Sequence, residues 1–297
     1  MEFLKEFQFK VDSLQFEESG EKKSNVDPDA QRLKPSAYSF SFSSEKDEGM
    51  YDAINRGFKL AIGGSGDQAL GNNKVRSNGS SAAENLTPGA QRLHVDSVIA
   101  WLNCDEQYLP GALEKVARWF SDHPQLDICF GDVLVVDGKG QLICGRRMVR
   151  PSRYHIVTDQ LPLYSAAMFI RAGALKKYRL FPDAAWKNTG DVELILRMLS
   201  QGVRYGFLNE YISAFTDTGE NLALDDQAAV EYDRLRQTAP WWVRRLRVLW
   251  VLNHRIRKLR AGCYHLEPLD YSIYIDSLSQ RHGFSEARPE SRWLSRL

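Results

Sequence analysis

The chain has 297 residues, enough for one large domain or two small ones with a sizeable buried core. Its 39 Lys and Arg residues nearly balance its 38 Asp and Glu residues, and the formal net charge of +1 argues against a nucleic-acid binder with a uniformly basic surface. With 43% hydrophobic and 11% aromatic residues, the composition is typical of a folded globular protein. We therefore expect no nucleic-acid partner.

The four cysteines, Cys104, Cys129, Cys144 and Cys263, lie far apart and show no metal-ligand spacing. Neither a zinc site nor a dense disulfide framework is expected, and we predict reduced thiols in a cytosolic protein. No apolar run reaches the roughly 18 residues that a membrane-spanning helix requires. The start, Met1–Glu6, is interrupted by acids and does not resemble a signal peptide.

The first third of the chain alternates between patterned and unpatterned segments. Residues 17–35 are charged and rich in turn formers, so a loop or a disordered segment is expected. Tyr38–Phe42 alternates aromatic residues with serine at the period of a strand. Residues 51–62 place apolar side chains at helical spacing, whereas Gly63 to about Asn85 is rich in Gly, Ser and Asn and predicts a long insertion.

The middle of the chain predicts a strand, an acidic loop and a helix in succession. Val98–Leu102 is a continuous apolar run, as expected for a strand buried on both faces of a parallel sheet. A helix is predicted to begin at Pro110 and to end at His123. Residues 128–143 predict two strands around a turn at Asp137–Gly140.

A helix over Asp191–Ser200 and a strand over Val203–Leu208 continue this order. Strands and helices that alternate in this way favour an α/β layered fold.

Asp105 follows the predicted strand, at the position where an open α/β sheet usually contacts its ligand. Mg²⁺ prefers oxygen ligands and commonly takes one or two carboxylates plus phosphate oxygens, which Asp105 can supply with Glu106 in support. In the alternative interpretation the acidic pair only caps the helix that begins near Pro110.

Asp191 and Glu193 place two carboxylates at the start of a predicted helix. A carboxylate in a cleft can accept a proton from a hydroxyl nucleophile. The alternative is a helix cap, in which Thr189 or Asp191 satisfies backbone N–H groups.

Five segments of the chain, taken in order, resemble the motifs of family 2 glycosyltransferases of the GT-A fold. They are Ser44–Gly57, Trp101–Glu106, Pro110–Leu113, Phe130–Asp132 and Gly190–Leu194. Phe215–Leu222 is similar to the Thr-Gly-x-Asn-Leu segment that follows the catalytic domain in many bacterial members. The resemblance covers about residues 38–224.

The resemblance implies inverting transfer of a sugar from a nucleotide-diphosphate donor to an acceptor hydroxyl, with Mg²⁺ or Mn²⁺ as cofactor. Asn103-Cys104-Asp105 occupies the place of the family's Asp-x-Asp element, so Asp105 is the expected metal ligand. Asp191 occupies the position of the catalytic base, although Gly190 replaces the acidic residue that usually precedes it.

Further residues match the border of the family's donor site. Asp47, Tyr51, Asp52 and Asn55 match its loop and helix, and with Asn103 they are the expected donor-binding residues. Tyr51 lies at helical spacing and fits the core equally well.

The resemblance fails at the N-terminus. Family members open with two strands whose loops, Thr-Pro-x-Tyr-Asn-like and Asp-Gly-x-Ser-x-Asp-like, hold the base and ribose, and neither loop occurs here. The predicted fold is therefore a GT-A-like mixed sheet with flanking helices and an incomplete N-terminal half. A mis-set or truncated start, a degenerate paralogue and a rebuilt pocket are three accounts of the difference.

The stretch from Pro240 to Arg260 interleaves arginines with Trp and aliphatic residues, and no acid occurs before Glu267. Such a helix can lie in a membrane interface near anionic lipid, which suits a lipid-linked or surface-polysaccharide acceptor. Alternatively, the helix packs on the catalytic domain with a solvated basic face.

We therefore expect three parts. They are a poorly ordered or divergent segment at 1–37, a GT-A-like domain at 38–233 with a flexible insertion at about 63–96, and a basic, Trp-rich helical extension at 234–297.

The expected function is a metal-dependent inverting glycosyltransferase of bacterial cell-envelope or exopolysaccharide synthesis. Its expected acceptor is a saccharide or a lipid-linked molecule, and its expected location is cytoplasmic or peripheral at the inner face of the membrane. The rival hypothesis is a catalytically silent GT-A-like protein that binds a partner enzyme or the membrane. A nucleotide-sugar dehydrogenase is disfavoured because no G-x-G-x-x-G follows a strand.

Overall fold

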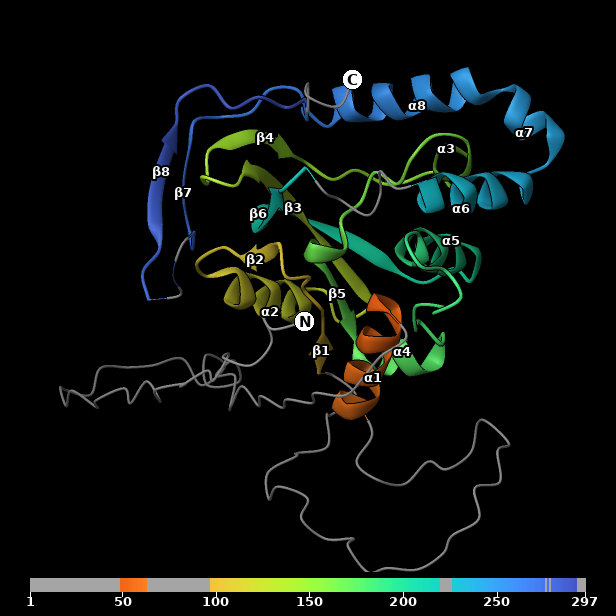
Figure 1. Ribbon diagram of the computed structural model, residues 1–297, viewed down its shortest axis with the longest axis horizontal. Helices are drawn as coiled ribbons and strands as arrows, with labels where there is room; N and C mark the ends of the chain where they lie inside the picture. Colours follow the sequence, from red (N-terminus) through yellow and green to blue (C-terminus); the bar gives the residue numbers. More distant parts are fainter. Residues whose placement is uncertain (1–48, 63–96, 220–225, 276, 278, 293–297) are drawn as a thin grey trace, which may run out of the picture. The chain divides into compact units, whose positions relative to one another are not determined.

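The computed structural model describes residues 49–62, 97–219, 226–275, 277 and 279–292 (Figure 1). The predicted strand at Tyr38–Phe42, the expected donor-binding residue Asp47 and the expected insertion at 63–96 lie outside the described residues.

The described residues form a mixture of α-helices and β-strands, which confirms the predicted α/β class. The helices are α1 Met50–Ile62, α2 Ala112–Asp122, α3 Arg153–Thr158, α4 Ala172–Lys177, α5 Gly190–Ser200, α6 Asp226–Gln237, α7 Trp241–Arg245 and α8 Arg247–Arg260. The strands are β1 Val98–Ile99, β2 Glu106–Tyr108, β3 Ile128–Asp137, β4 Leu142–Arg146, β5 Met168–Arg171, β6 Tyr205–Asp217, β7 Leu269–Ile273 and β8 His282–Glu286.

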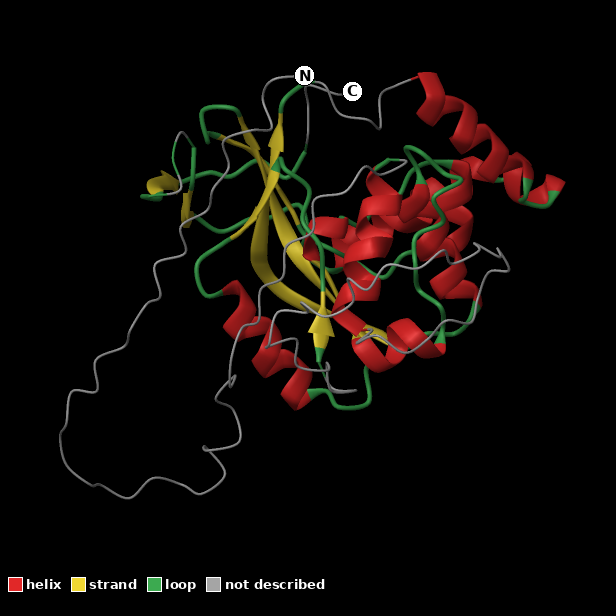
Figure 2. Cartoon of the chain, turned by 60° about the horizontal axis from the view of Figure 1, so that its bottom comes forward, coloured by secondary structure: helices red, strands yellow, loops and turns green. Residues whose placement is uncertain are grey.

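A six-stranded mixed sheet carries the fold, with strand order β1-β5-β3-β6-β2 and with β4 paired to β3. The central strands β3 and β6 run parallel, from the pair Ile128 and Tyr205 to the pair Asp137 and Asp217, whereas every other pairing in this sheet is antiparallel. β3 is buried along nearly its whole length, as its apolar sequence requires. Figure 2 shows the curved sheet with most of the helices gathered along one side.

The prediction of a parallel strand over Val98–Leu102 is wrong in length and direction. Only Val98 and Ile99 form β1, and they pair antiparallel with β5. Trp101 is buried instead by its edge-on contact with Phe58 of α1, with ring centroids 5.5 Å apart. An apolar run indicates burial but not the element that buries it. For Trp101 that element is helix α1 rather than a neighbouring strand.

The predicted hairpin around Asp137–Gly140 is confirmed as β3 and β4. The helix expected from Pro110 begins at Ala112, because Gly111 adopts the left-handed conformation with φ 71°. The strand expected over Val203–Leu208 continues to Asp217, because β3 and β2 supply partners beyond Leu208.

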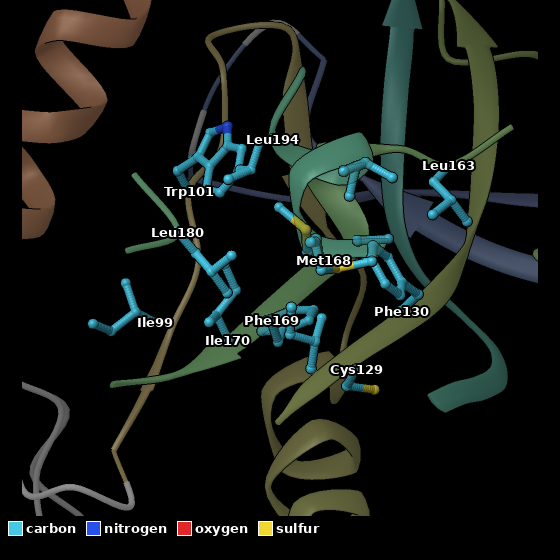
Figure 3. Close-up of a cluster of buried hydrophobic side chains, with 14 of the residues drawn as sticks. Ile99, Trp101, Cys129, Phe130, Leu163, Met168, Phe169, Ile170, Leu180 and Leu194 are labelled. Atoms are coloured by element: carbon cyan, nitrogen blue, oxygen red, sulfur yellow. The ribbon is translucent and has the colours of Figure 1, made fainter. Parts of the chain in front are cut away.

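Two apolar clusters hold the sheet. The larger joins β3, β5 and the helices, and Figure 3 shows Phe130, Met168 and Leu194 among its members. In the smaller cluster, Leu134 and Val136 of β3 pack with Tyr271 and Ile273 of β7.

The C-terminal extension differs from the expected helical one. Helices α7 and α8 are followed by a hairpin of β7 and β8, which packs on the sheet through the smaller cluster. The hydroxyl of Tyr271 donates a hydrogen bond to the carbonyl of Gly140 at 2.8 Å, which ties β7 to the β3–β4 turn.

Helix α8 packs against α3 through aromatic rings and an ion pair. The rings of His155 and His254 stack with centroids 4.1 Å apart, and Tyr154 contacts Trp250 at 4.8 Å. Arg247 pairs with Asp159 at 2.8 Å. Among the described helices, none combines the length and apolar composition that a bilayer crossing requires.

We predict that His254 makes folding stability depend on pH. Burial, assisted by the charges of His155, Lys258 and other nearby basic groups, lowers the pKa of His254 to about 3. Because the unfolded chain then binds the proton more readily, stability should fall as the pH drops from about 6.5 towards 3, by up to about 1.4 kcal/mol per pH unit. Chemical denaturation across this range should show a shallower slope for His254→Phe.

The same substitution at the exposed His265 is the matched control and should keep the parental slope. An unchanged slope in His254→Phe would contradict the assignment.

Candidate functional site

Asp191 and Tyr51 meet at the start of α5, although they lie 140 positions apart in the sequence. The Tyr51 hydroxyl donates to Oδ1 of Asp191 at 3.2 Å and accepts the Asp191 backbone N–H at 3.1 Å. Oδ1 also accepts the backbone N–H of Val192 at 2.8 Å. No hydrogen bond to Oδ2 is found among the described residues, so one oxygen fixes the carboxylate while the other is available for chemistry.

Burial raises the pKa of the Asp191 carboxyl above its ordinary value, and the hydrogen bonds from Val192 and Tyr51 only partly offset this effect. The residue as a whole is nevertheless partly accessible to solvent. Burial also moves the Tyr51 pKa upward, with the nearby Asp191 charge adding to the effect, so Tyr51 stays a neutral donor. A carboxylate with a raised pKa and a free oxygen is suited to accept a proton.

Gly190 allows the Tyr51 ring to reach Asp191. A Cβ at position 190 would lie 2.6 Å from the ring of Tyr51, closer than carbon atoms approach without movement. The ring is buried, with 3% of its surface exposed, so it has little room to shift. A side chain at position 190 would therefore collide with the Tyr51 ring.

Glu231 of α6 fixes the loop that enters α5, and sequence analysis missed it. Its carboxylate accepts the backbone N–H groups of Lys187, Asn188 and Thr189 at 2.7–3.0 Å, and the Thr189 hydroxyl at 2.9 Å. Burial raises the Glu231 pKa, but these bonds outweigh burial and leave the pKa lowered. The sequence pattern is not assigned a helix over residues 226–237, and nothing in the sequence identifies the partners of Glu231.

The helix-cap alternative for this region is only partly right. The Thr189 hydroxyl donates to Glu231 and makes no cap hydrogen bond to α5. Glu193 points along the helix to Arg197 and forms an ion pair at 2.9 Å. Asp191 does satisfy one backbone N–H at the helix start, so its structural role is compatible with a chemical one.

The acidic loop before β2 closes on itself. The Glu106 carboxylate accepts the backbone N–H of Asn103 at 2.7 Å and its side-chain amide at 3.2 Å. The Asp105 carbonyl accepts the N–H of Thr216 on β6 at 2.8 Å, which anchors the loop to the sheet. The acidic pair does not cap α2, since α2 begins at Ala112 without a side-chain cap. Asn103 thus organises the loop with Glu106.

Asp105 and Asp191 both act electrostatically on Glu106. Burial raises the pKa of Glu106 to about 7, and the charges of Asp105 and Asp191 add to this effect. The loop at residues 103–106 and the start of α5 therefore border a common acidic region. Among the described residues, no three His, Cys, Asp or Glu side chains gather as a metal site of their own.

Two expected donor-site residues of α1 make structural contacts. Asp52 pairs with Arg56 at 2.9 Å. The Asn55 amide donates to the Pro182 carbonyl at 2.6 Å, while its Oδ1 is buried without a hydrogen-bond partner among the described residues. Of the expected donor-binding residues, the structure brings Tyr51 to Asp191 and Asn103 to Glu106. The other two make structural contacts, because Asp52 pairs within α1 and Asn55 bonds α1 to the loop at Pro182.

Asp132, from the motif Phe130–Asp132, has a structural position. It is 2% exposed and accepts the Met148 N–H at 2.7 Å, with Arg147 at 3.5 Å. Burial raises its pKa to about 6, despite these partners.

Two cavities on the described surface differ in character. Asp191 and Ile195 line a small one with Phe130, Leu163 and Tyr164. A larger, open one of about 810 Å³ lies between β6, the start of α2 and the β7–β8 hairpin, and none of the predicted site residues lines it.

Two comparisons with known proteins assign no family to the chain. A scan against protein-family models finds no match. A search of curated proteins also finds none.

We predict that Gly190→Ala disrupts the contact between Tyr51 and Asp191. The added methyl overlaps the Tyr51 ring, and overpacking of this kind should cost about 1–3 kcal/mol of the free energy of unfolding. Chemical denaturation measures the loss.

Gly57→Ala is the matched control, because Gly57 lies in α1 with open space around it. That change should be neutral or stabilising, since Ala favours a helix over Gly. Equal stability of Gly190→Ala and the parent would contradict the close packing at Tyr51.

Proposed function

We propose that the chain is a metal-dependent inverting glycosyltransferase with a GT-A-like fold, which moves a sugar from a nucleotide-diphosphate donor to an acceptor hydroxyl. The observation that carries the proposal is the arrangement of Asp191: buried enough for a raised pKa, fixed at Oδ1 by Tyr51, and without a hydrogen bond at Oδ2 among the described residues. The motif order from Ser44 to Leu222 supplies the reaction class.

Asp191 acts as the base in this proposal. The acceptor hydroxyl loses its proton to Oδ2 while its oxygen attacks the anomeric carbon of the donor sugar, and the bond from that carbon to the diphosphate breaks. Because Tyr51 and Val192 hold Oδ1, the carboxylate cannot rotate freely, and this limits the orientations in which it meets the hydroxyl.

Asp105 is the proposed ligand of Mg²⁺ or Mn²⁺. Its chemistry fits a hard cation, because the residue is partly exposed and no hydrogen bond to its carboxylate is found among the described residues. One protein carboxylate together with diphosphate oxygens is a common set for such ions. When bound, the cation offsets charge on the diphosphate leaving group. Asn103 and Glu106 hold the loop that presents Asp105.

The acceptor we propose is a saccharide or a lipid-linked molecule of bacterial cell-envelope or exopolysaccharide synthesis, used on the cytoplasmic side. This part of the proposal rests on the resemblance of residues 38–224 to bacterial members of the family.

A second candidate is a catalytically silent protein of the same fold that binds a partner. The observation that favours it is the structural use of the expected donor residues: Asp52 pairs with Arg56, and Asn55 bonds to Pro182. The two predictions below separate the candidates.

Asp105→Asn should abolish metal-dependent binding of sugar nucleotides. A neutral amide cannot supply the charge that holds a hard cation beside a diphosphate. Calorimetric titration of UDP- and GDP-sugars, with and without Mg²⁺ or Mn²⁺, measures the effect. Asp122→Asn, on the exposed surface of α2, is the control and should bind as the parent does. Metal-dependent binding that survives in Asp105→Asn would remove Asp105 from the site.

Asp191→Asn should lower turnover by about 10²-fold or more with little change in donor affinity, because only proton removal is lost. The fold should persist, since an amide oxygen can still accept the hydrogen bonds of Tyr51 and Val192. Sugar transfer is measured alongside donor binding. Transfer at the parental rate would leave Asp191 with a structural role alone, and transfer by neither protein would favour the silent candidate.

A further inference from the structure

Helix α8 has an apolar face on its outer side. His254 is buried against α3, and Lys258 lies on the same inner side, partly buried. Five large apolar side chains are exposed instead: Val248 at 76%, Leu249 at 53%, Leu252 at 51%, Ile256 at 39% and Leu259 at 61%. The side of α8 that packs on the protein is therefore not its main apolar side.

These five residues form one continuous stripe, called here the α8 stripe. At 100° per residue they fall within about 100° of the helix circumference, centred roughly opposite His254. Over its 14 residues the helix is about 21 Å long. Figure 1 shows α8 at the edge of the described elements, with α7 next to its N-terminal end. Contiguous exposed apolar surface of this kind marks an interaction site.

Positive charge borders the α8 stripe. Arg255 and Arg260 flank the stripe on α8, and Arg244 and Arg245 lie on the preceding helix α7. All four arginines are exposed, and no ion pair is found for them among the described residues. The sequence contains no Asp or Glu from Pro240 to Leu266.

Tryptophan extends the apolar surface beyond α8. Trp241 of α7 is 70% exposed, and Leu246 between the two helices is 39% exposed. Trp is enriched where one end of a side chain meets apolar material and the other meets water.

We propose that α7 and α8 bind an anionic lipid bilayer, with the α8 stripe inserted at the level between headgroups and acyl chains. The helix lies in the plane of the surface, so the arginines at its borders reach lipid phosphates while the aliphatic side chains enter the apolar layer. The inner face, with His254 and the ion pair of Arg247 with Asp159, keeps the helix attached to the protein. The surface serves to bring the chain to the membrane.

Charge distinguishes a bilayer from a second copy of the chain. Two copies joined through the α8 stripe would bring the same arginines together, and facing like charges disfavour association. An anionic surface offers the opposite charge to all four arginines at once. The inference does not depend on glycosyltransferase activity, because vesicle binding is measured without any sugar substrate.

Vesicle co-sedimentation of the full chain tests the proposal. Vesicles of phosphatidylcholine with phosphatidylglycerol should bind the parent, and vesicles of phosphatidylcholine alone should bind it at least about tenfold more weakly. Leu252→Asn combined with Ile256→Asn should weaken binding by about tenfold or more. Arg255→Gln combined with Arg260→Gln should remove most of the preference for the anionic vesicles, as should high salt.

Val230→Asn is the matched control, because Val230 is 67% exposed on α6, outside the α8 stripe. It should bind as the parent does. The stripe variant replaces exposed side chains, so its thermal unfolding should stay parental and a loss of binding cannot be ascribed to misfolding.

Three results would overturn the proposal. They are failure of the parent to bind anionic vesicles, equal binding of the stripe variant and the parent, and a lipid-free dimer, seen by light scattering, that the stripe variant dissociates.

Discussion

The carboxylate of Glu231 fixes the loop from which the candidate site is built. A buried charge is costly unless hydrogen bonds compensate it, and here three consecutive backbone N–H groups and the Thr189 hydroxyl supply that compensation. The backbone N–H groups of residues 187–189 thereby gain an acceptor, and this holds the loop from which α5 begins at Gly190. Asp191 then meets Tyr51 of α1, which lies 140 positions earlier in the sequence. The geometry of the site depends on this anchor more than on the cap of α5 itself.

Close packing at Gly190 also positions Asp191. Gly190 leaves space for the Tyr51 ring, and the ring carries the hydroxyl that holds Oδ1 of Asp191. A residue with a side chain at position 190 would move the ring and release the carboxylate. The glycine at position 190 and the tyrosine hydroxyl beside Asp191 are therefore two parts of one arrangement. The same region also holds Glu106, whose pKa rises to about 7 with burial and the nearby charges of Asp105 and Asp191.

Helix α8 shows a different use of amphipathicity. Ring contacts with α3, such as the stacking of His254 on His155, attach α8 to the protein. Its main apolar face is directed away from the protein. Periodicity predicts such a helix correctly but does not tell which side packs on the protein. In the structure α8 packs on α3 through His254, and its outer side carries both the α8 stripe and the exposed arginines at its borders.

The sequence by itself determined the helices at 51–62 and 191–200 and the hairpin around Asp137–Gly140, because helical periodicity and turn chemistry are local properties. It also singled out Asp191, Asp105 and Tyr51 through the order of their motifs. Only the tertiary structure decided that Val98 and Ile99 pair antiparallel, that β7 and β8 cover part of the sheet, and that Glu231 holds the loop before α5. Strand direction, and the partner of a buried carboxylate more than 40 residues away, are set by long-range packing and hydrogen bonding, which leave no periodic signal in the chain.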